Sequence, residues 1–184
     1  MPRLWTIDPS QATGETGELL AAVQQSLGVV PNMATALATS PAALKGWLEL
    51  NRALHGGQLD SGLQERIAIG IAEANQCTYC LSAHTYVGKH VLKLSDQDIH
   101  ETRHLSSSDA KIDAALTFAR TVLDTRGGVS DADIEAVRAA GYSDGEIAEI
   151  VSHVALNVLT NYFNKVADVE IEFPLVEPHR HAAA

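Results

Sequence analysis

Apolar residues recur at three- and four-residue intervals along much of this chain. One such stripe, in the second half of the chain, comprises Ile112, Leu116, Ala119 and Leu123. Another, nearer the C-terminus, comprises Ile147, Val151, Val154, Val158 and Tyr162. This spacing places apolar side chains on one face of a helix. No window alternates with a period of two between hairpin turns, so the pattern predicts an all-α fold.

Three segments repeat one helix-start signal: LSDQDI at 94–99, VSDADI at 129–134 and YSDGEI at 142–147. In each, the serine can cap free backbone N–H groups, and the acidic residue three positions later can complete a capping box. The apolar residues on either side match a hydrophobic staple. We therefore expect helices to begin directly after Ser95, Ser130 and Ser143.

Other boundaries follow from proline, aspartate and glycine. Ser40 before Pro41 predicts a helix that ends at Gly56 and Gly57, and Asp60 predicts the start of the next helix. Further helix ends are expected at Gly127, Gly128 and Gly141. The ending EFPLVEPHRHAAA has two prolines and little periodicity, so residues from about 170 to 184 are expected to form an extended arm with a disordered end.

Composition limits the class of protein. The chain has 184 residues, 46% of them hydrophobic, and no low-complexity linker, which predicts a single helical domain over 1–184. A formal net charge of −10 without a Lys/Arg cluster argues against a nucleic-acid partner. The chain contains neither a membrane-length apolar run nor an N-terminal targeting pattern, so we expect a cytoplasmic protein without a membrane partner.

The chain's two cysteines lie close together in ANQCTYCLSAHTYVGK, residues 74–89. If a helix begins at Gln76 or Cys77, then Cys77, Cys80 and His84 share one face, and the helix start favours thiolates. His84 lies one turn beyond Cys80 but two turns, roughly 10 Å of rise, beyond Cys77. Cys80 is therefore the better candidate for the attacking sulfur, with Cys77 as the resolving one.

Two other interpretations of this cluster stay open at this point. The cysteines could be small buried hydrophobes beside a core histidine. They could also bind a metal with His84, although a fourth ligand would have to come from His153 or Glu65. Of the three, a redox-active dithiol is favoured for two close cysteines in a cytosolic chain.

Several other polar and aromatic residues have mainly structural interpretations. Asn157, Asn161 and Asn164 form a polar line with His153, for which a solvated face is favoured over a subunit boundary or an active-site entrance. Trp47 and Tyr162 are expected to pack in the core or at an interface. The remaining histidines are expected at the surface: His55, His90, His100, His104, His179 and His181.

The segment LQERIAIGIAEANQCTYCLSAHTYVGK resembles the signature of the alkylhydroperoxidase AhpD and carboxymuconolactone decarboxylase-like superfamily, in its peroxidase-related subgroup. VPNM, TSPAALKGWLELNRAL and LNVLTNYFNKVADVEIEFP are also similar to that subgroup, so the resemblance covers most of the chain. It implies an AhpD-like helical bundle that forms a homo-oligomer, a trimer or a hexamer.

By position, the resemblance also implies roles for individual residues. It assigns Glu65 to the proton relay, Cys77 as resolving cysteine, Cys80 as peroxidatic cysteine and His84 as base. Glu73 is a nearer carboxylate and a rival to Glu65. Tyr79 stands where AhpD peroxidases have a histidine; it is a candidate relay residue, but a phenol cannot shuttle protons near neutral pH as imidazole can.

The function implied by the resemblance is a thiol-dependent peroxidase that reduces alkyl hydroperoxides without a cofactor or metal. A dithiol, which in AhpD is a lipoylated protein, would reduce the enzyme again. The alternatives are a general thiol–disulfide oxidoreductase, a redox or metal-binding Cys-His module without turnover, and a structural oligomer with a vestigial centre. The family's decarboxylases lack this cysteine pair, so lactone decarboxylation is not expected.

Overall fold

The computed structural model describes residues 2–179, and within them the chain forms nine helices and no strands. The helices are α1 (Gly14–Leu27), α2 (Asn32–Leu37), α3 (Pro41–His55), α4 (Ser61–Ala74), α5 (Thr78–His90), α6 (Asp96–Arg103), α7 (Ala110–Thr125), α8 (Asp131–Ala139) and α9 (Asp144–Ala167). The prediction of an all-α fold is therefore confirmed.

The helix starts follow the serine signals. Ser95, Ser130 and Ser143 are the N-caps of α6, α8 and α9, and each forms a complete capping box. Ser40 and Asp60 cap α3 and α4, also through their side chains. Neither α1 nor α2 has such a side-chain cap bond, and the sequence pattern did not single them out.

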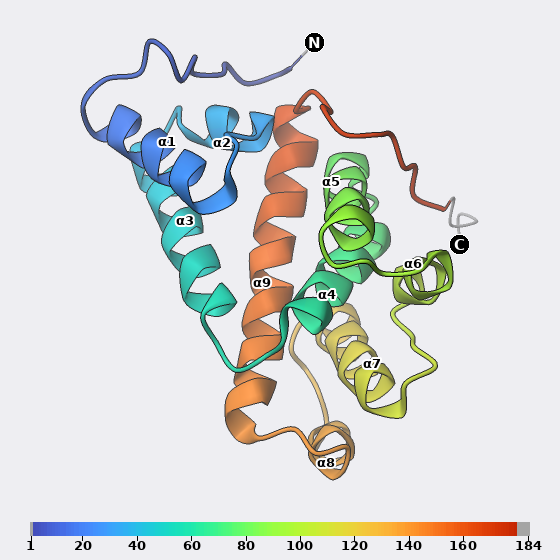
Figure 1. Ribbon diagram of the computed structural model, residues 1–184. Coiled ribbons are helices and arrows are strands. Elements are labelled where there is room, and N and C mark those ends of the chain that lie inside the picture. The colour runs from blue at the N-terminus through green and yellow to red at the C-terminus, as the bar shows by residue number, and fades with distance from the viewer. Residues whose placement is uncertain (1, 180–184) are drawn as a thin grey trace.

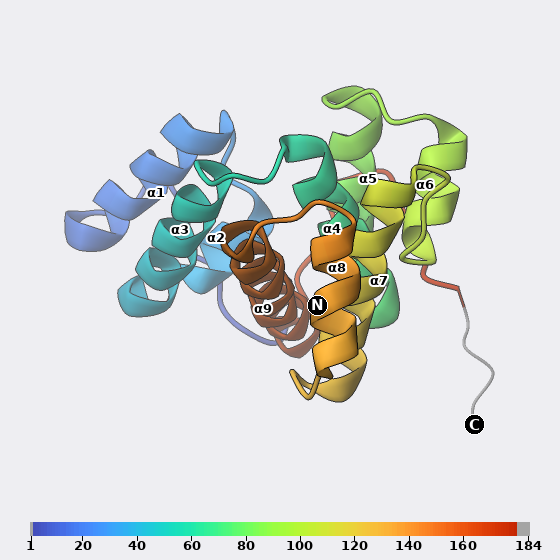
Figure 2. The same ribbon diagram turned by 90° about the horizontal axis from the view of Figure 1, so that it is seen from below.

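The long helix α9 runs through the middle of the molecule, with α1, α2 and α3 on one side and α4, α5 and α7 on the other (Figures 1 and 2). Helix α4 packs against α5, α6, α7 and α9, and it is buried from Arg66 to Glu73. A Cβ at Gly70 would collide with Leu105, so this glycine permits the chain after α6 to approach α4 closely. The site residues of α4 and α5 are thus held by packing on several sides.

The segment after α9 crosses the molecule as an extended arm, drawn in red in Figure 1. Asn32 Nδ2 donates to the carbonyl of Glu170 at 3.0 Å, and the backbone N–H of Val176 donates to Ser82 Oγ at 2.9 Å. Farther along, Arg103 donates to the carbonyl of Glu177 at 2.8 Å. Residues 170–179 form neither helix nor strand, and the expected disorder at the end of the arm falls on residues outside the described part.

Trp47 and Tyr162, which were both expected to pack in the core or at an interface, differ in their exposure. Trp47 is buried in the core, as expected. Tyr162 is 56% exposed, so the expectation that it packs in the core is wrong for this chain, and its packing at an interface stays a prediction. Within residues 2–179 no helix is both long and apolar enough to span a membrane.

Candidate active site

The two cysteines lie at the start of α5, as the sequence predicts. Gln76 adopts a left-handed conformation, with φ of 55°, that turns the chain from α4 into α5. Cys77 is the N-cap of α5, and its sulfur accepts the backbone N–H of Cys80 at 3.3 Å. The two sulfurs are joined in a disulfide, and both cysteines are buried. The structure therefore holds the pair in its oxidised state.

Glu65 of α4 and His84 of α5 form the polar pair beside this disulfide. Glu65 Oε1 lies 2.8 Å from His84 Nδ1. Because a carboxylate accepts hydrogen bonds, this contact places the proton on Nδ1 and leaves Nε2 as the free ring nitrogen. The glutamate side chain is 12% exposed and the histidine side chain 31% exposed, so the pair is only partly open to solvent.

Opposing effects set the pKa of His84. Burial of the imidazole lowers its pKa, but the charge of Glu65 and the hydrogen bond to it together outweigh burial. The net result is a pKa above the ordinary value of 6.5. The Glu65 carboxylate therefore both orients the ring and makes it a stronger base.

Asn164 of α9 is buried next to the sulfur of Cys80, although its sequence pattern favours a solvated face. Its amide Nδ2 donates to Cys80 Sγ at 3.2 Å. Asn157, Asn161 and Asn164 are buried together with His153, so the expectation of a solvated face is wrong. The reason is the central position of α9, which has packed helices on both sides (Figure 2).

Tyr79 is bound to the arm rather than to the Glu65–His84 pair. Its hydroxyl donates to Glu172 Oε1 at 2.8 Å and accepts the backbone N–H of Met33 at 3.2 Å. Burial raises the pKa of Tyr79 far above its ordinary value, so the phenol stays protonated. A relay role for Tyr79 stays a prediction that these contacts do not support.

Glu73, the rival carboxylate, has other partners. Its Oε2 accepts from Arg103 Nε at 2.6 Å, and its Oε1 accepts the backbone N–H of His179 at 2.6 Å. These contacts tie α4 to α6 and to the arm. The carboxylate that contacts His84 is that of Glu65.

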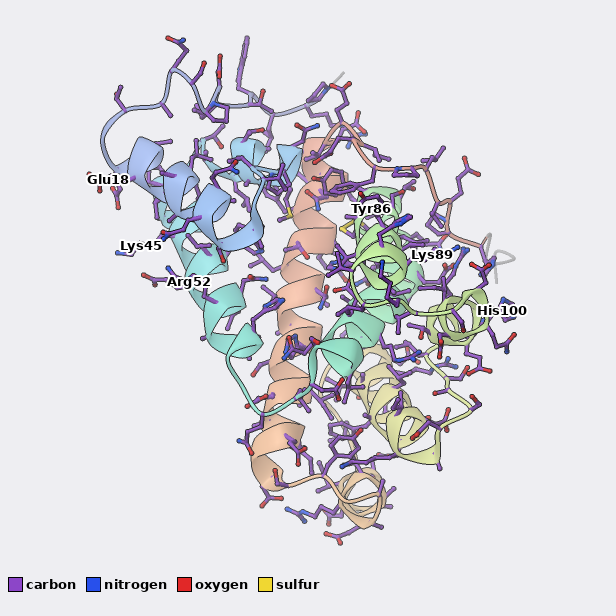
Figure 3. The ribbon with its side chains drawn as sticks, viewed as in Figure 1. Glu18, Lys45, Arg52, Tyr86, Lys89 and His100 are labelled. Carbon is purple, nitrogen blue, oxygen red and sulfur yellow. A yellow bond between two sulfur atoms is a disulfide. The ribbon has the colours of Figure 1, made fainter. Side chains whose placement is uncertain are left out.

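Cys80 and His84 line one cavity of about 370 Å³, together with Glu65 and Asn164. Its apolar wall includes Met33, Trp47, Leu156 and Phe173. Tyr86 projects from α5 close to the arm (Figure 3), and its ring lies 6.0 Å from that of Phe173. Cys77 does not line the cavity, so of the two cysteines only Cys80 borders the space where a ligand fits.

The alternative of a metal site and the expected surface position of the remaining histidines can be compared with the structure. In the part of the chain that the structure describes, no group of three or more His, Cys, Asp or Glu side chains is arranged to hold a metal ion. Five histidines expected at the surface are exposed: His55, His90, His100, His104 and His179. His181 lies outside the described residues.

Comparison with known proteins supports this description of the fold. Residues 41–125 match the model of the carboxymuconolactone decarboxylase family. An alkyl hydroperoxide reductase of Mycobacterium tuberculosis is 30% identical over 80 residues, which are 43% of this chain and 23% of that protein. This chain thus aligns with about a quarter of that relative's length.

Two solved structures resemble this chain over more than nine tenths of its length. The first is an uncharacterized peroxidase-related protein of Ralstonia eutropha JMP134 with an alkylhydroperoxidase AhpD core. It is 26% identical with a TM-score of 0.81, over 93% of this chain and 92% of that chain. The second, a peroxidase-related protein of Silicibacter sp. TM1040, is 25% identical with a TM-score of 0.78, over 91% and 89% of the two chains. Residues 41–125 are thus similar to the carboxymuconolactone decarboxylase family, and the chain shares its helical fold with peroxidase-related proteins that have an AhpD core.

Proposed function

We propose that the protein is a thiol-dependent peroxidase that reduces alkyl hydroperoxides through Cys77 and Cys80, with His84 and Glu65 moving the proton. The observation that carries this proposal is the 2.8 Å contact between Glu65 and His84 on the same cavity that Cys80 lines. A nucleophile, a base and a group that orients the base are thereby gathered around a space that a substrate can enter.

In the first step, the reduced Cys80 gives its proton to His84 Nε2. The Cys80 thiolate attacks the terminal oxygen of the hydroperoxide, an S–O bond forms, and the O–O bond breaks. The proton on His84 passes to the departing alkoxide, so the peroxide is reduced to an alcohol while Cys80 becomes a sulfenic acid. Asn164 favours this step because its amide donates to the sulfur and stabilises negative charge on it.

In the second step, the Cys77 thiol attacks the Cys80 sulfenic acid, water leaves, and the disulfide forms. This disulfide is the state of the pair in the structure. An external dithiol then reduces the pair by two exchange reactions and is itself oxidised to a disulfide. We propose a lipoylated protein as that dithiol, in keeping with the resemblance to AhpD.

A general thiol–disulfide oxidoreductase is the second candidate. It is favoured because residue 79, between the cysteines, is a tyrosine whose hydroxyl is bonded to Glu172, so this position does not supply a second imidazole to the site. Purified protein with dihydrolipoamide as reductant separates the two functions. Turnover of cumene hydroperoxide at least tenfold faster than that of a small disulfide supports the peroxidase; the reverse order supports the oxidoreductase.

We also propose that the chain is a single cytoplasmic domain that assembles into a trimer or hexamer and has no nucleic-acid or membrane partner. Support for an assembly comes from the exposed apolar side chains of Val151, Leu159, Tyr162 and Val166 along α9. Sedimentation velocity tests it: Leu159→Glu is expected to shift the assembly toward monomer, and an unchanged sedimentation coefficient would count against this face.

A further inference from the structure

The cavity beside Cys80 is much larger than a small peroxide requires. A volume of about 370 Å³ lies in the range of pockets that hold drug-sized ligands. Apolar side chains from several elements line it, including Leu27, Val29 and Pro31 before α2, Trp47 of α3 and Val91 after α5. A ligand that fills this space must therefore have an apolar body.

A line of polar side chains on α9 runs along the same cavity. Asn164, Thr160, Asn157 and His153 all line it, and all are buried. Asn164 contacts Cys80, whereas His153 lies eleven residues earlier, which is about 16 Å along the helix. The cavity therefore has a reactive end at Cys80 and a second polar end at His153.

His153 has an unused hydrogen-bonding atom at that second end. The residue is 2% exposed, and its Nε2 has no hydrogen-bond partner within residues 2–179. A buried polar atom without a partner is costly, and a ligand at this end of the cavity removes that cost when the imidazole ring turns Nε2 toward it. Burial, and then the neighbouring His55, lower the pKa of His153 to about 4, against a small opposing effect of Glu149. The imidazole is therefore neutral at physiological pH.

The charges around the cavity disfavour an anionic head group at the His153 end. No Lys or Arg lines it, and the carboxylate that does line it, Glu65, is bonded to His84. His84, whose pKa is raised, lies at the Cys80 end and is bonded to Glu65. A carboxylate at the His153 end would lose its hydration without a Lys or Arg partner, which is strongly unfavourable. A neutral hydroxyl or carbonyl has no such penalty.

From these observations we infer that the site binds an uncharged, elongated apolar hydroperoxide whose far end carries a hydroxyl or carbonyl that hydrogen-bonds to His153. The hydroperoxide group in this statement rests on the proposed function; the uncharged apolar body and the polar far end rest on the cavity alone. His153 is then a positioning residue that selects the substrate, and it takes no part in the chemistry at Cys80.

Binding of alcohols tests the inference without any peroxide. The probes are 1,10-decanediol, 1-decanol and 10-hydroxydecanoate, in which a hydroxyl stands for the alcohol product. Trp5 is 89% exposed and Trp47 lines the cavity, so in the oxidised Trp5→Phe protein the remaining tryptophan reports binding by fluorescence. We expect the diol to bind about five- to tenfold more tightly than the mono-alcohol, and the carboxylate at least about tenfold more weakly than the diol.

Variants of His153 identify the partner of the second hydroxyl. In His153→Phe, the diol and the mono-alcohol should bind equally well, whereas His153→Gln, which keeps a donor and an acceptor, should retain most of the preference. His100→Phe is the matched control, because His100 is exposed on α6 (Figure 3) and does not line the cavity. It should bind the three probes as the parent protein does.

Two results would overturn the inference. One is a carboxylate probe that binds as tightly as the diol; the other is a diol preference that is absent in the parent protein or persists in His153→Phe. If His153→Phe does not fold, the affinities of the three probes for the parent protein and for His153→Gln still test the inference. If the protein shows the expected binding pattern but does not turn over peroxide, the proposed function is refuted. The inferred class of ligand, uncharged and apolar with a polar far end, is then still supported.

Discussion

Glu65 Oε1 and His84 Nδ1 lie 2.8 Å apart and join two helices, α4 and α5. The contact fixes which ring nitrogen of His84 carries the proton, and it holds the pKa of the imidazole above 6.5 even though burial alone would lower it. In the proposed mechanism, the carboxylate thus determines the pH range in which His84 accepts a proton from Cys80.

Replacement of this carboxylate by an amide should reverse the direction of the shift. In Glu65→Gln, burial of the imidazole acts without the opposing charge, so we expect the pKa of His84 to fall below 6.5. Titration of the histidine ring signals by NMR measures it, and the oxidised protein is suitable because its disulfide does not titrate.

Glu73→Gln is the matched control on the same helix. Glu73 is bonded to Arg103 and the backbone of His179, so its replacement should leave the pKa of His84 unchanged. An unaltered pKa in Glu65→Gln, or an equal fall in both variants, would show that Glu65 does not tune this base.

Asn164 should stabilise the thiolate of Cys80. Its amide donates to the sulfur at 3.2 Å, and a hydrogen bond to a charged group contributes about 1.5–3 kcal/mol. In a Cys77→Ser background, Asn164→Leu should therefore raise the pKa of the Cys80 thiol by about one unit or more. The ultraviolet absorbance of the thiolate as a function of pH measures this shift.

Asn157→Leu is the control for the loss of a buried amide on α9. Asn157 Nδ2 donates to the carbonyl of His153 at 2.8 Å, within its own helix. The thiol pKa should stay unchanged in this variant. An Asn164→Leu protein with the parent pKa would mean that the amide does not stabilise the reduced sulfur.

Cys77→Ser should separate the two chemical steps. Only Cys80 borders the cavity, so its reaction with hydroperoxide should proceed at a rate within a few-fold of that of the parent, and the sulfenic acid should then persist. Trapping with dimedone and peptide mass spectrometry locates the adduct, which we expect on Cys80. Labelling of Cys77 in Cys80→Ser, with no labelling of Cys80 in Cys77→Ser, would reverse the assignment of the two sulfurs.

Tyr79→Phe tests the link between the dithiol helix and the arm. The variant removes the bond to Glu172 and leaves the buried N–H of Met33 without its acceptor. The free energy of unfolding should therefore fall by about 1–3 kcal/mol. Amide hydrogen exchange in residues 172–176 should become faster. If stability and exchange stay unchanged while peroxide turnover collapses, Tyr79 acts in the proton relay after all.

The fold was predictable where the signal is local. The capping boxes at Ser95, Ser130 and Ser143 depend on residues three positions apart, and all three form. Helices α1 and α2 begin after Thr13 and Pro31, neither of which makes a side-chain cap bond, so the sequence offered no comparable signal for them.

The site was predictable in part for the same reason. The positions of Cys77, Cys80 and His84 follow from the start of one helix, and the contact of Glu65 with His84 was implied by the family resemblance. Asn164 was missed because a line of polar residues on a helix is compatible with a solvated face and with a buried one. Only the packing of α3, α4 and α5 against α9 decides between these environments.

A single-turnover reaction tests the central claim most directly. Reduced protein is mixed with one equivalent of cumene hydroperoxide in a stopped-flow instrument, and loss of peroxide is followed together with loss of thiols. The account predicts that one peroxide disappears for each Cys77–Cys80 disulfide formed, and that Cys80→Ser abolishes the reaction. Peroxide consumption by Cys80→Ser at the rate of the parent protein would contradict it.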